Sequence, residues 1–242
     1  VVEEIKQMTN MSFQIYDPSL TINPSYSREL FKALIREKVK KSWVASGNVD
    51  VLARIDDDFL KLAKKSGCFE WFIGFESVNQ TALNGIKKNS NKVKDFKRTI
   101  KRIHDHGMTV QGGIIFGFDE DTPDIFDATL EKLFEWEIDI LETYVLTPFP
   151  GTPLYDRLEK EKRILTKDWS RYNLTDVVFK PKNMTEKELF EGARKVAKEF
   201  YTMPRIISRV ARIMTVSVRP SVILPIGTNF ILRKSHKRDY IF

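Results

Sequence analysis

Short apolar runs and amphipathic helical patterns alternate five times along this chain of 242 residues. The runs that we expect to form strands are 11–16, 42–46, 69–75, 108–118 and 138–146. Between them, apolar residues recur every three or four positions, which is the spacing of one helix face. Parallel strands need crossover connections, and helices supply them, so this order predicts an α/β fold with a parallel sheet. The five units fit either an open doubly wound sheet or most of a curved barrel.

Capping residues mark several ends of the predicted helices. Asn23, with a proline directly after it, is typical of a helix start. Gly67 and Gly107 are typical of helix ends. Beyond the last strand, Thr185 and Glu188 form a capping box, which predicts a further helix that packs across the sheet domain.

The excess positive charge is confined to the end of the chain. The whole sequence carries 40 Lys and Arg, 33 Asp and Glu, and a formal charge of +7. Residues 205–242 hold eight of the basic residues and one acid, so the preceding 204 residues carry 32 of each sign. Because nucleic-acid binding needs a cationic face on the folded body, this distribution argues against a nucleic-acid partner.

The single cysteine, Cys68, also limits the function. One cysteine excludes an intramolecular disulfide and any metal site that needs several thiolates of this chain, and it suits a reducing compartment. No apolar stretch reaches the length of a membrane span, and the first residues do not resemble a signal peptide. We therefore expect a cytoplasmic location.

Polar residues stand where the predicted strands end. In both candidate architectures, small molecules bind at the carboxyl ends of parallel strands. The residues at four of these ends are Asp17, 74–77, 117–121 and 147–153. The acids could simply cap the following helices. Because four polar ends would converge on one rim, we favour a small-molecule site.

Four segments resemble the radical S-adenosylmethionine superfamily. They are FIGFESVNQTALNGIKKNSN (72–91), GMTVQGGIIFGFDEDTPDIF (107–126), LTPFPGTPLYDRL (146–158) and DWSRYN (168–173). More narrowly, they are similar to the branch in which a cobalamin-binding domain precedes the barrel and a short domain of unknown function follows it. The resemblance covers nearly the whole chain.

The resemblance implies a domain organisation. Residues 1–158 would form units two to six of a partial (β/α)6 barrel. Residues 159–204 would form a mainly helical extension that packs on the barrel, and residues 205–242 a basic tail.

The resemblance also implies S-adenosylmethionine as a cofactor, bound by six residues. These are Asp17, Glu76, Ser77, Ile114, Phe116 and Gly117. Asp17 would lie near the methionyl end of the cofactor, and Glu76 and Ser77 would hold its ribose or carboxylate. Ile114 to Gly117 would line the adenine, and Lys92 could add a positive charge near the carboxylate. The residues agree with this chemistry, because acids and hydroxyls suit ribose hydroxyls and apolar side chains suit a flat base.

One defining feature of that family does not occur in this sequence. Its members carry a Cys-x3-Cys-x2-Cys loop whose thiolates hold a [4Fe-4S] cluster, and such a cluster needs several cysteines. We expect Cys68 to be a small buried residue instead. The cluster and cobalamin are thus expected in an intact parent enzyme, with ligands outside this chain, and the chain alone would be inactive.

Two explanations of the missing loop remain. The chain begins at Val1 in what resembles the helix after the first strand, which favours a truncated enzyme over a degenerate pseudoenzyme. A non-catalytic binding module that uses the rim or the basic tail to hold a partner is a further alternative. An unrelated metal enzyme fits poorly, because His104 and His106 lie together at a predicted helix end, where the helix dipole accounts for them.

The start of the tail has the pattern of a basic amphipathic helix. Arg205, Arg209 and Arg212 form a stripe beside apolar positions. Such helices can lie on anionic membranes, so the stripe suggests peripheral membrane contact. The substrate and the type of reaction are not indicated by the sequence.

Overall fold

A computed structural model describes residues 1–216, 221 and 223–237. The elements are α1 (Val2–Gln7), β1 (Ser12–Ile15), α2 (Pro24–Arg36), β2 (Ser42–Ser46), α3 (Val49–Arg54), α4 (Asp57–Ser66), β3 (Cys68–Glu76), α5 (Gln80–Gly85), α6 (Val93–Asp105), β4 (Thr109–Phe116), α7 (Ile125–Glu135), β5 (Ile140–Val145), α8 (Pro153–Lys160), a 3-10 turn (Trp169–Arg171), α9 (Glu186–Phe200), α10 (Met203–Val216) and α11 (Ile223–Lys237). Arg219, Arg238 and Asp239 of the expected tail lie outside the described residues.

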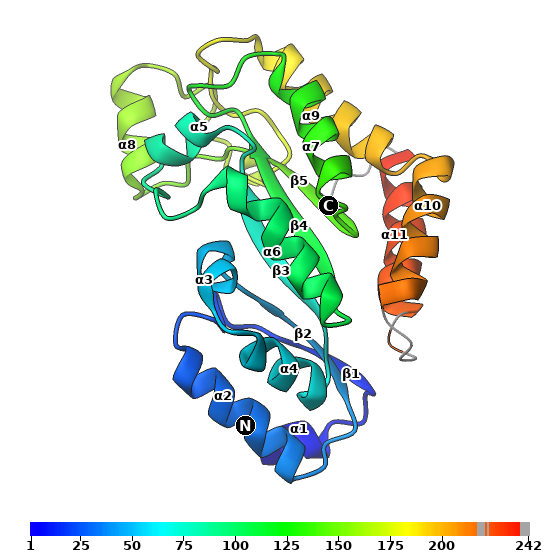
Figure 1. The fold of residues 1–242 in the computed structure, drawn as a ribbon. Helices are drawn as coiled ribbons and strands as arrows, with labels where there is room; N and C mark the ends of the chain where they lie inside the picture. The colour runs from blue at the N-terminus through cyan, green and yellow to red at the C-terminus, as the bar shows by residue number, and fades with distance from the viewer. Residues whose placement is uncertain (217–220, 222, 238–242) are drawn as a thin grey trace.

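The strands form one parallel sheet in the order β1-β2-β3-β4-β5. The sheet curls along this order, and helices cover its convex side (Figure 1). A doubly wound sheet would reverse its strand order at a switch point, whereas a barrel adds each strand beside the last. The sequential order therefore confirms the expected α/β half-barrel and excludes the doubly wound alternative.

Aromatic side chains fill the layer between the sheet and its helices. Trp43 of β2 lies between Phe31 of α2 and Trp71 of β3, with ring centroids 5.2 and 5.8 Å away. Phe59 of α4 contacts Phe31 at 5.2 Å and Trp71 at 6.4 Å. All four rings are fully buried. They come from alternate strand positions and from one face of each helix, as the sequence periodicity predicts.

The predicted helix ends agree with the local geometry. The Asn23 side chain accepts a hydrogen bond from the Tyr26 N–H at 3.1 Å. Gly67 ends α4 with φ 117°, a left-handed conformation that favours glycine. The two short helices α3 and α5 were not predicted, because six residues contain too few turns for a clear periodicity.

The carboxyl-terminal part is helical, as expected. Helix α9 packs against β5 and α7, and its capping box of Thr185 and Glu188 is present. Helices α10 and α11 form a hairpin along the β5 edge (Figure 1). The boundary expected after Pro204 falls inside the first turn of α10.

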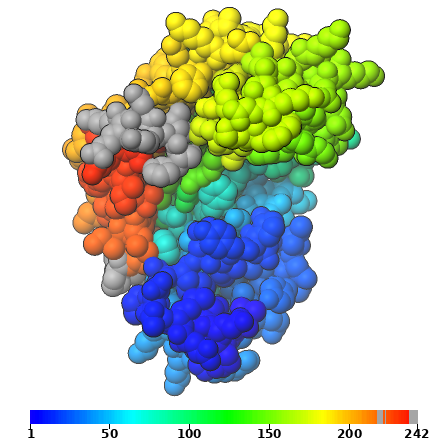
Figure 2. Space-filling model, turned by 180° about the vertical axis from the view of Figure 1, so that it is seen from behind, coloured from blue at the N-terminus to red at the C-terminus, as the bar shows by residue number. Residues whose placement is uncertain are grey.

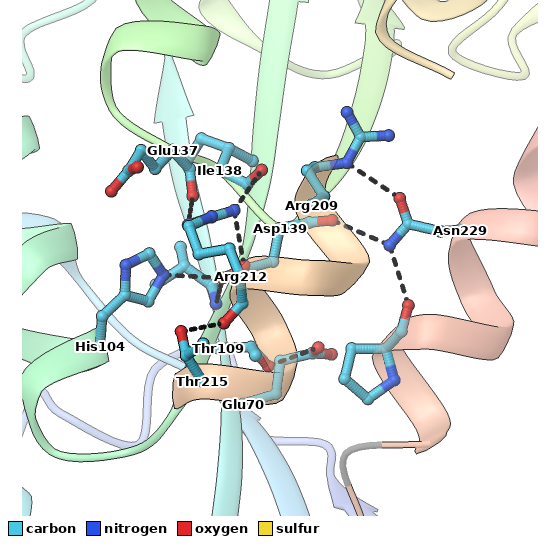
Figure 3. A network of polar contacts seen from close by, with 12 residues as sticks. Glu70, His104, Thr109, Glu137, Ile138, Asp139, Arg209, Arg212, Thr215 and Asn229 are labelled. Carbon is cyan, nitrogen blue, oxygen red and sulfur yellow. Dashed lines mark hydrogen bonds and ion pairs between the residues drawn. The ribbon is translucent and has the colours of Figure 1, made fainter. Parts of the chain in front are cut away.

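A buried ionic network joins this hairpin to the barrel (Figure 3). The carboxylate of Asp139, before β5, accepts hydrogen bonds from the Val110 N–H and from His104 Nε2, both at 2.8 Å. Arg212 of α10 forms an ion pair with the same carboxylate at 2.8 Å. The Asn229 amide of α11 donates to the Asp139 carbonyl at 3.0 Å. The sequence predicted only a favourable interaction of His104 with the helix dipole. The structure shows that His104 also contacts the Asp139 carboxylate.

We predict that Asp139→Ala strongly destabilises the fold. The substitution removes the carboxylate that pairs with Arg212 and accepts from the Val110 N–H. Breaking a buried ion pair costs about 3 kcal/mol or more. Urea unfolding followed by circular dichroism measures this loss. The control is Asp105→Ala, which removes an exposed carboxylate paired with Lys101 and should cost less than about 1 kcal/mol. Equal losses for the two variants would contradict a structural role of the network.

Candidate functional site

The concave side of the sheet is lined by alternate residues of the strands. It forms a hollow of ≈ 530 Å³ that reaches from Gln14 on β1 to Glu142 on β5. Val44, Phe72 and Gln111 line its floor. Their sequence neighbours face the helices, because successive side chains of a strand point to opposite sides.

A second hollow of ≈ 310 Å³ adjoins the first at the carboxyl ends of β2 and β3. The two share Pro18, Ser46 and Phe72 in their linings. Asp17 lines the first hollow and Glu76 the second, so the structure brings these two predicted residues to adjoining cavities. Asp17 also accepts a hydrogen bond from the Ser19 N–H at 2.9 Å, which shapes the turn after β1.

Glu76 adopts an unusual backbone conformation. Its φ is 66°, in the left-handed region that costs a residue with a side chain roughly 1–2 kcal/mol. The other non-glycine residues described with positive φ follow helical turns, whereas Glu76 ends a strand at a register shift against β4. Such strain is retained mainly at functional positions.

Gly74 leaves room for the Glu76 carboxylate. A Cβ atom at position 74 would lie 2.6 Å from Glu76 Oε1. The carboxylate forms an ion pair with Lys88, which also lines the second hollow. Lys92, the counter-charge suggested by the sequence, instead lines a neighbouring depression with Asp95. The sequence suggested Lys92 as the positive charge of the site, but Lys88 is the lysine that pairs with Glu76.

Ser77 is buried and its hydroxyl is used locally. Its Oγ accepts a hydrogen bond from the Asn79 N–H at 3.0 Å. This bond shapes the turn that leads into α5. The structure therefore places Ser77 next to Glu76, with a role in the loop geometry.

The side chains of Ile114 and Phe116 do not line the concave side. Both are buried, and the Phe116 ring lies 5.2 Å from that of Phe126 on α7. Both residues thus occupy the helix-facing positions of β4, and their expected contact with a base stays a prediction. Ile115, between them, is half-buried and takes the concave position. A ligand on the concave side could reach Ile114 and Phe116 only through their backbone.

Gly117 is required by the packing of the extension. It has φ 106°, and a Cβ atom there would lie 2.9 Å from Leu189 of α9. The Gly117 N–H donates to Asp121 Oδ2 at 2.9 Å. Burial raises the pKa of Asp121 to about 6. Asp119 forms ion pairs with Arg157 and Arg163, so the acids after β4 hold the extension in place and do not face the hollows.

Three polar residues at the concave side were not singled out from the sequence. The Glu142 carboxylate accepts hydrogen bonds from the Gln111 amide and from the Tyr144 hydroxyl. Burial raises the pKa of Glu142. The sequence feature that could have identified these residues is a polar side chain inside a mostly apolar strand. Gln111 and Glu142 have this pattern, at alternate positions that face a cavity.

Glu70 is a buried acid at the other end of β3. Its carboxylate accepts a hydrogen bond from the Thr109 hydroxyl at 3.1 Å. Burial raises the pKa of Glu70 to about 8. The folded protein therefore holds a proton on Glu70 that the unfolded chain releases near the ordinary pKa of 4.5.

We predict that Glu70 makes the fold less stable as the pH rises. Below the ordinary pKa both states are protonated. Between that value and about pH 8, the free energy of unfolding should fall by about 1.4 kcal/mol per pH unit relative to Glu70→Gln. Urea titrations of both proteins across this window measure the difference. Parallel stability curves would show that Glu70 ionises like an exposed carboxyl.

The donor set fits S-adenosylmethionine but not an iron–sulfur cluster. The adjoining hollows offer the carboxylates of Asp17 and Glu76, the Lys88 ammonium and the Phe72 ring, which suit a cofactor with hydroxyl, charged and aromatic parts. Cys68 is fully buried at the start of β3, whereas Glu76 ends this strand. A cluster needs several thiolates, so this chain does not supply its ligands.

Comparisons with known proteins agree with the fold. Residues 152–223 match the family model "Domain of unknown function (DUF4070)". The chain is 31% identical to bacteriochlorophyllide d C-12(1)-methyltransferase of Chlorobaculum tepidum over 82% of the chain and 42% of that protein. It is 27% identical to anaerobic magnesium-protoporphyrin IX monomethyl ester cyclase of Cereibacter sphaeroides over 83% of the chain and 33% of that protein. The chain thus spans less than half the length of these curated relatives.

Among solved structures, the chain is similar to the radical S-adenosylmethionine methyltransferase TsrM from Kitasatospora setae, which was solved with cobalamin and a [4Fe-4S] cluster bound. The TM-score is 0.61 at 15% identity, covering 98% of the chain and 54% of TsrM. A second match is the radical S-adenosylmethionine enzyme HemN of Escherichia coli, with a TM-score of 0.52 at 16% identity over 75% of the chain and 39% of HemN. The chain is thus similar in sequence to curated methyltransferases and cyclases, and it has the fold of these radical S-adenosylmethionine enzymes.

Proposed function

We propose that the concave side of this half-barrel binds S-adenosylmethionine and that the chain is part of a cobalamin-linked radical enzyme that transfers a methyl group. The relatives named above include a methyltransferase, and the similar structure of TsrM is a methyltransferase with cobalamin. When bound, S-adenosylmethionine would supply the methyl group and the radical precursor. The [4Fe-4S] cluster would be held by cysteines outside this chain. The substrate is not assigned.

The conformation of Glu76 is the observation that carries this proposal. The strand bulge, the left-handed φ and the missing side chain at Gly74 together hold one carboxylate at the edge of a hollow. That carboxylate would accept hydrogen bonds from the ribose hydroxyls or from the methionyl ammonium. Lys88 would balance its charge and offer a contact to the cofactor carboxylate.

Asp17 and Phe72 would also contact the bound S-adenosylmethionine. Phe72 lies where the two hollows meet and offers a flat apolar surface. Asp17 would bind from the β1 side. Gly113, which pairs with Gly74 across β3 and β4, leaves room for the Phe72 ring, because a Cβ atom there would lie 3.3 Å from it.

We predict that Glu76→Gln weakens binding of S-adenosylmethionine. A buried or half-buried hydrogen bond to a charged group contributes about 1.5–3 kcal/mol, so the dissociation constant should rise by roughly tenfold or more. Isothermal titration calorimetry on the chain measures the change directly. The matched control is Glu131→Gln, an exposed glutamate of α7, which should bind like the parent.

The proposal is wrong if the parent chain binds S-adenosylmethionine no better than it binds adenosine and methionine added together. It also fails if both glutamate variants bind equally well while their unfolding curves match the parent. If Glu76→Gln impairs folding, those unfolding curves will show it. Glu76→Asp is then the second variant, because it keeps the charge and shortens the side chain.

A further inference from the structure

The outward surface of the α10–α11 hairpin is apolar. The side chains of Ile207 and Met214 on α10 are 60% and 61% exposed, and those of Ile223 and Ile231 on α11 are 69% and 64% exposed. Ile207 and Met214 are seven residues apart on one helix face, as are Leu224 and Ile231 on the other helix. Figure 2 shows the two helices, in orange and red, on the outer flank of the molecule.

Two of the three arginines expected to meet a membrane, Arg209 and Arg212, are held against the protein, whereas Arg205 is exposed. Arg209 is buried, its Nε donates to Asn229 at 3.0 Å, and its guanidinium lies 3.9 Å from the centre of the Phe200 ring. Arg212 is held by Asp139, and Arg205 lies over Phe134 at 3.7 Å. Arg209 and Arg212 therefore hold the hairpin on the barrel, and the membrane contact expected for this stripe stays a prediction.

The charge of the hairpin has one sign. The sequence holds no Asp or Glu from Met203 to Lys237. Lys234 is exposed among the outward residues of α11. No helix in the described part of the chain is long and apolar enough to cross a bilayer. The outward face thus combines large apolar side chains with the exposed Lys234 and no acid, in helices too short or too polar to span a membrane.

We propose that the outward face of the α10–α11 hairpin docks on an anionic lipid surface. Helices that lie in a membrane interface bury an apolar face below the headgroups and place basic residues beside the phosphates. Ile207, Met214, Ile223 and Ile231 would enter the acyl boundary, and Lys234 would remain at headgroup level. A second copy of the chain fits this face less well, because two such faces would bring cations together without acids to pair them.

Vesicle flotation tests this proposal with the full chain. Vesicles of equal parts phosphatidylglycerol and phosphatidylcholine should carry the chain to the top of the gradient, and vesicles of phosphatidylcholine alone should carry clearly less. The double variant Ile207→Ser/Ile231→Ser should bind the anionic vesicles roughly tenfold more weakly, because two large apolar side chains no longer leave water. The change adds no charge, so it tests the apolar contact alone.

The matched control is Ile22→Ser/Leu165→Ser, which alters two apolar residues that are 77% and 50% exposed elsewhere on the molecule. It should float like the parent, and unfolding curves of both double variants should match that of the parent. Failure of the parent to float, or equal flotation of both double variants, would overturn the proposal. A parent dimer in sedimentation that Ile207→Ser/Ile231→Ser converts to a monomer, without vesicle binding, would assign the face to self-association instead.

Discussion

A parallel sheet leaves two apolar faces, and in this protein helices cover the convex one. The crossover helices must all lie on one side when each strand is added next to the last, since right-handed connections place them there. The other side curls into a concave surface that is lined by Phe72, Gln111 and Glu142, among others. Burial of polar groups at such a surface is costly unless they have partners. The half-barrel therefore favours a ligand or a further part of a longer protein at its concave side.

The extension contributes stability and shape to this surface. Gly117 and Asp121 fix the loop after β4 against α9, and Asp119 ties it to Arg157 and Arg163. At the opposite end, the Asp139 network joins α10 and α11 to the start of β5 (Figure 3). Asp119, which looked like a rim acid in the sequence, thus pairs with Arg157 and Arg163, whereas Asp17 and Glu76 line the two hollows.

The fold could be predicted from periodicity because each strand and long helix repeats a simple spacing. The site could be predicted only in part. Glu76 was expected at the site because it follows a glycine in the strand end, and it lines a hollow. Its pairing with Lys88 depends on the loop after α5, which has no periodic signal. Ile114 and Phe116 occupy the helix-facing positions of β4. Residues 112–116 are all apolar or glycine and do not show which alternate positions face the helices, so only Gln111, earlier on the strand, indicates the concave side.

The inward position of Arg209 and Arg212 could not be predicted from the sequence either. A stripe of arginines beside apolar residues fits a membrane surface and a docked helix equally well. The choice depends on Asp139 and on the rings of Phe134 and Phe200, which are distant in sequence. Only the tertiary structure shows that these partners meet Arg212, Arg205 and Arg209.

The central claim is that the concave side, with Glu76 at its edge, is the cofactor site. Photolabelling with an azido derivative of S-adenosylmethionine, followed by peptide mapping, tests it most directly. The account predicts label in peptides that contain residues 72–91 or 109–118, and loss of that label when excess S-adenosylmethionine is present. Protectable label confined to α9, α10 or α11 would contradict it.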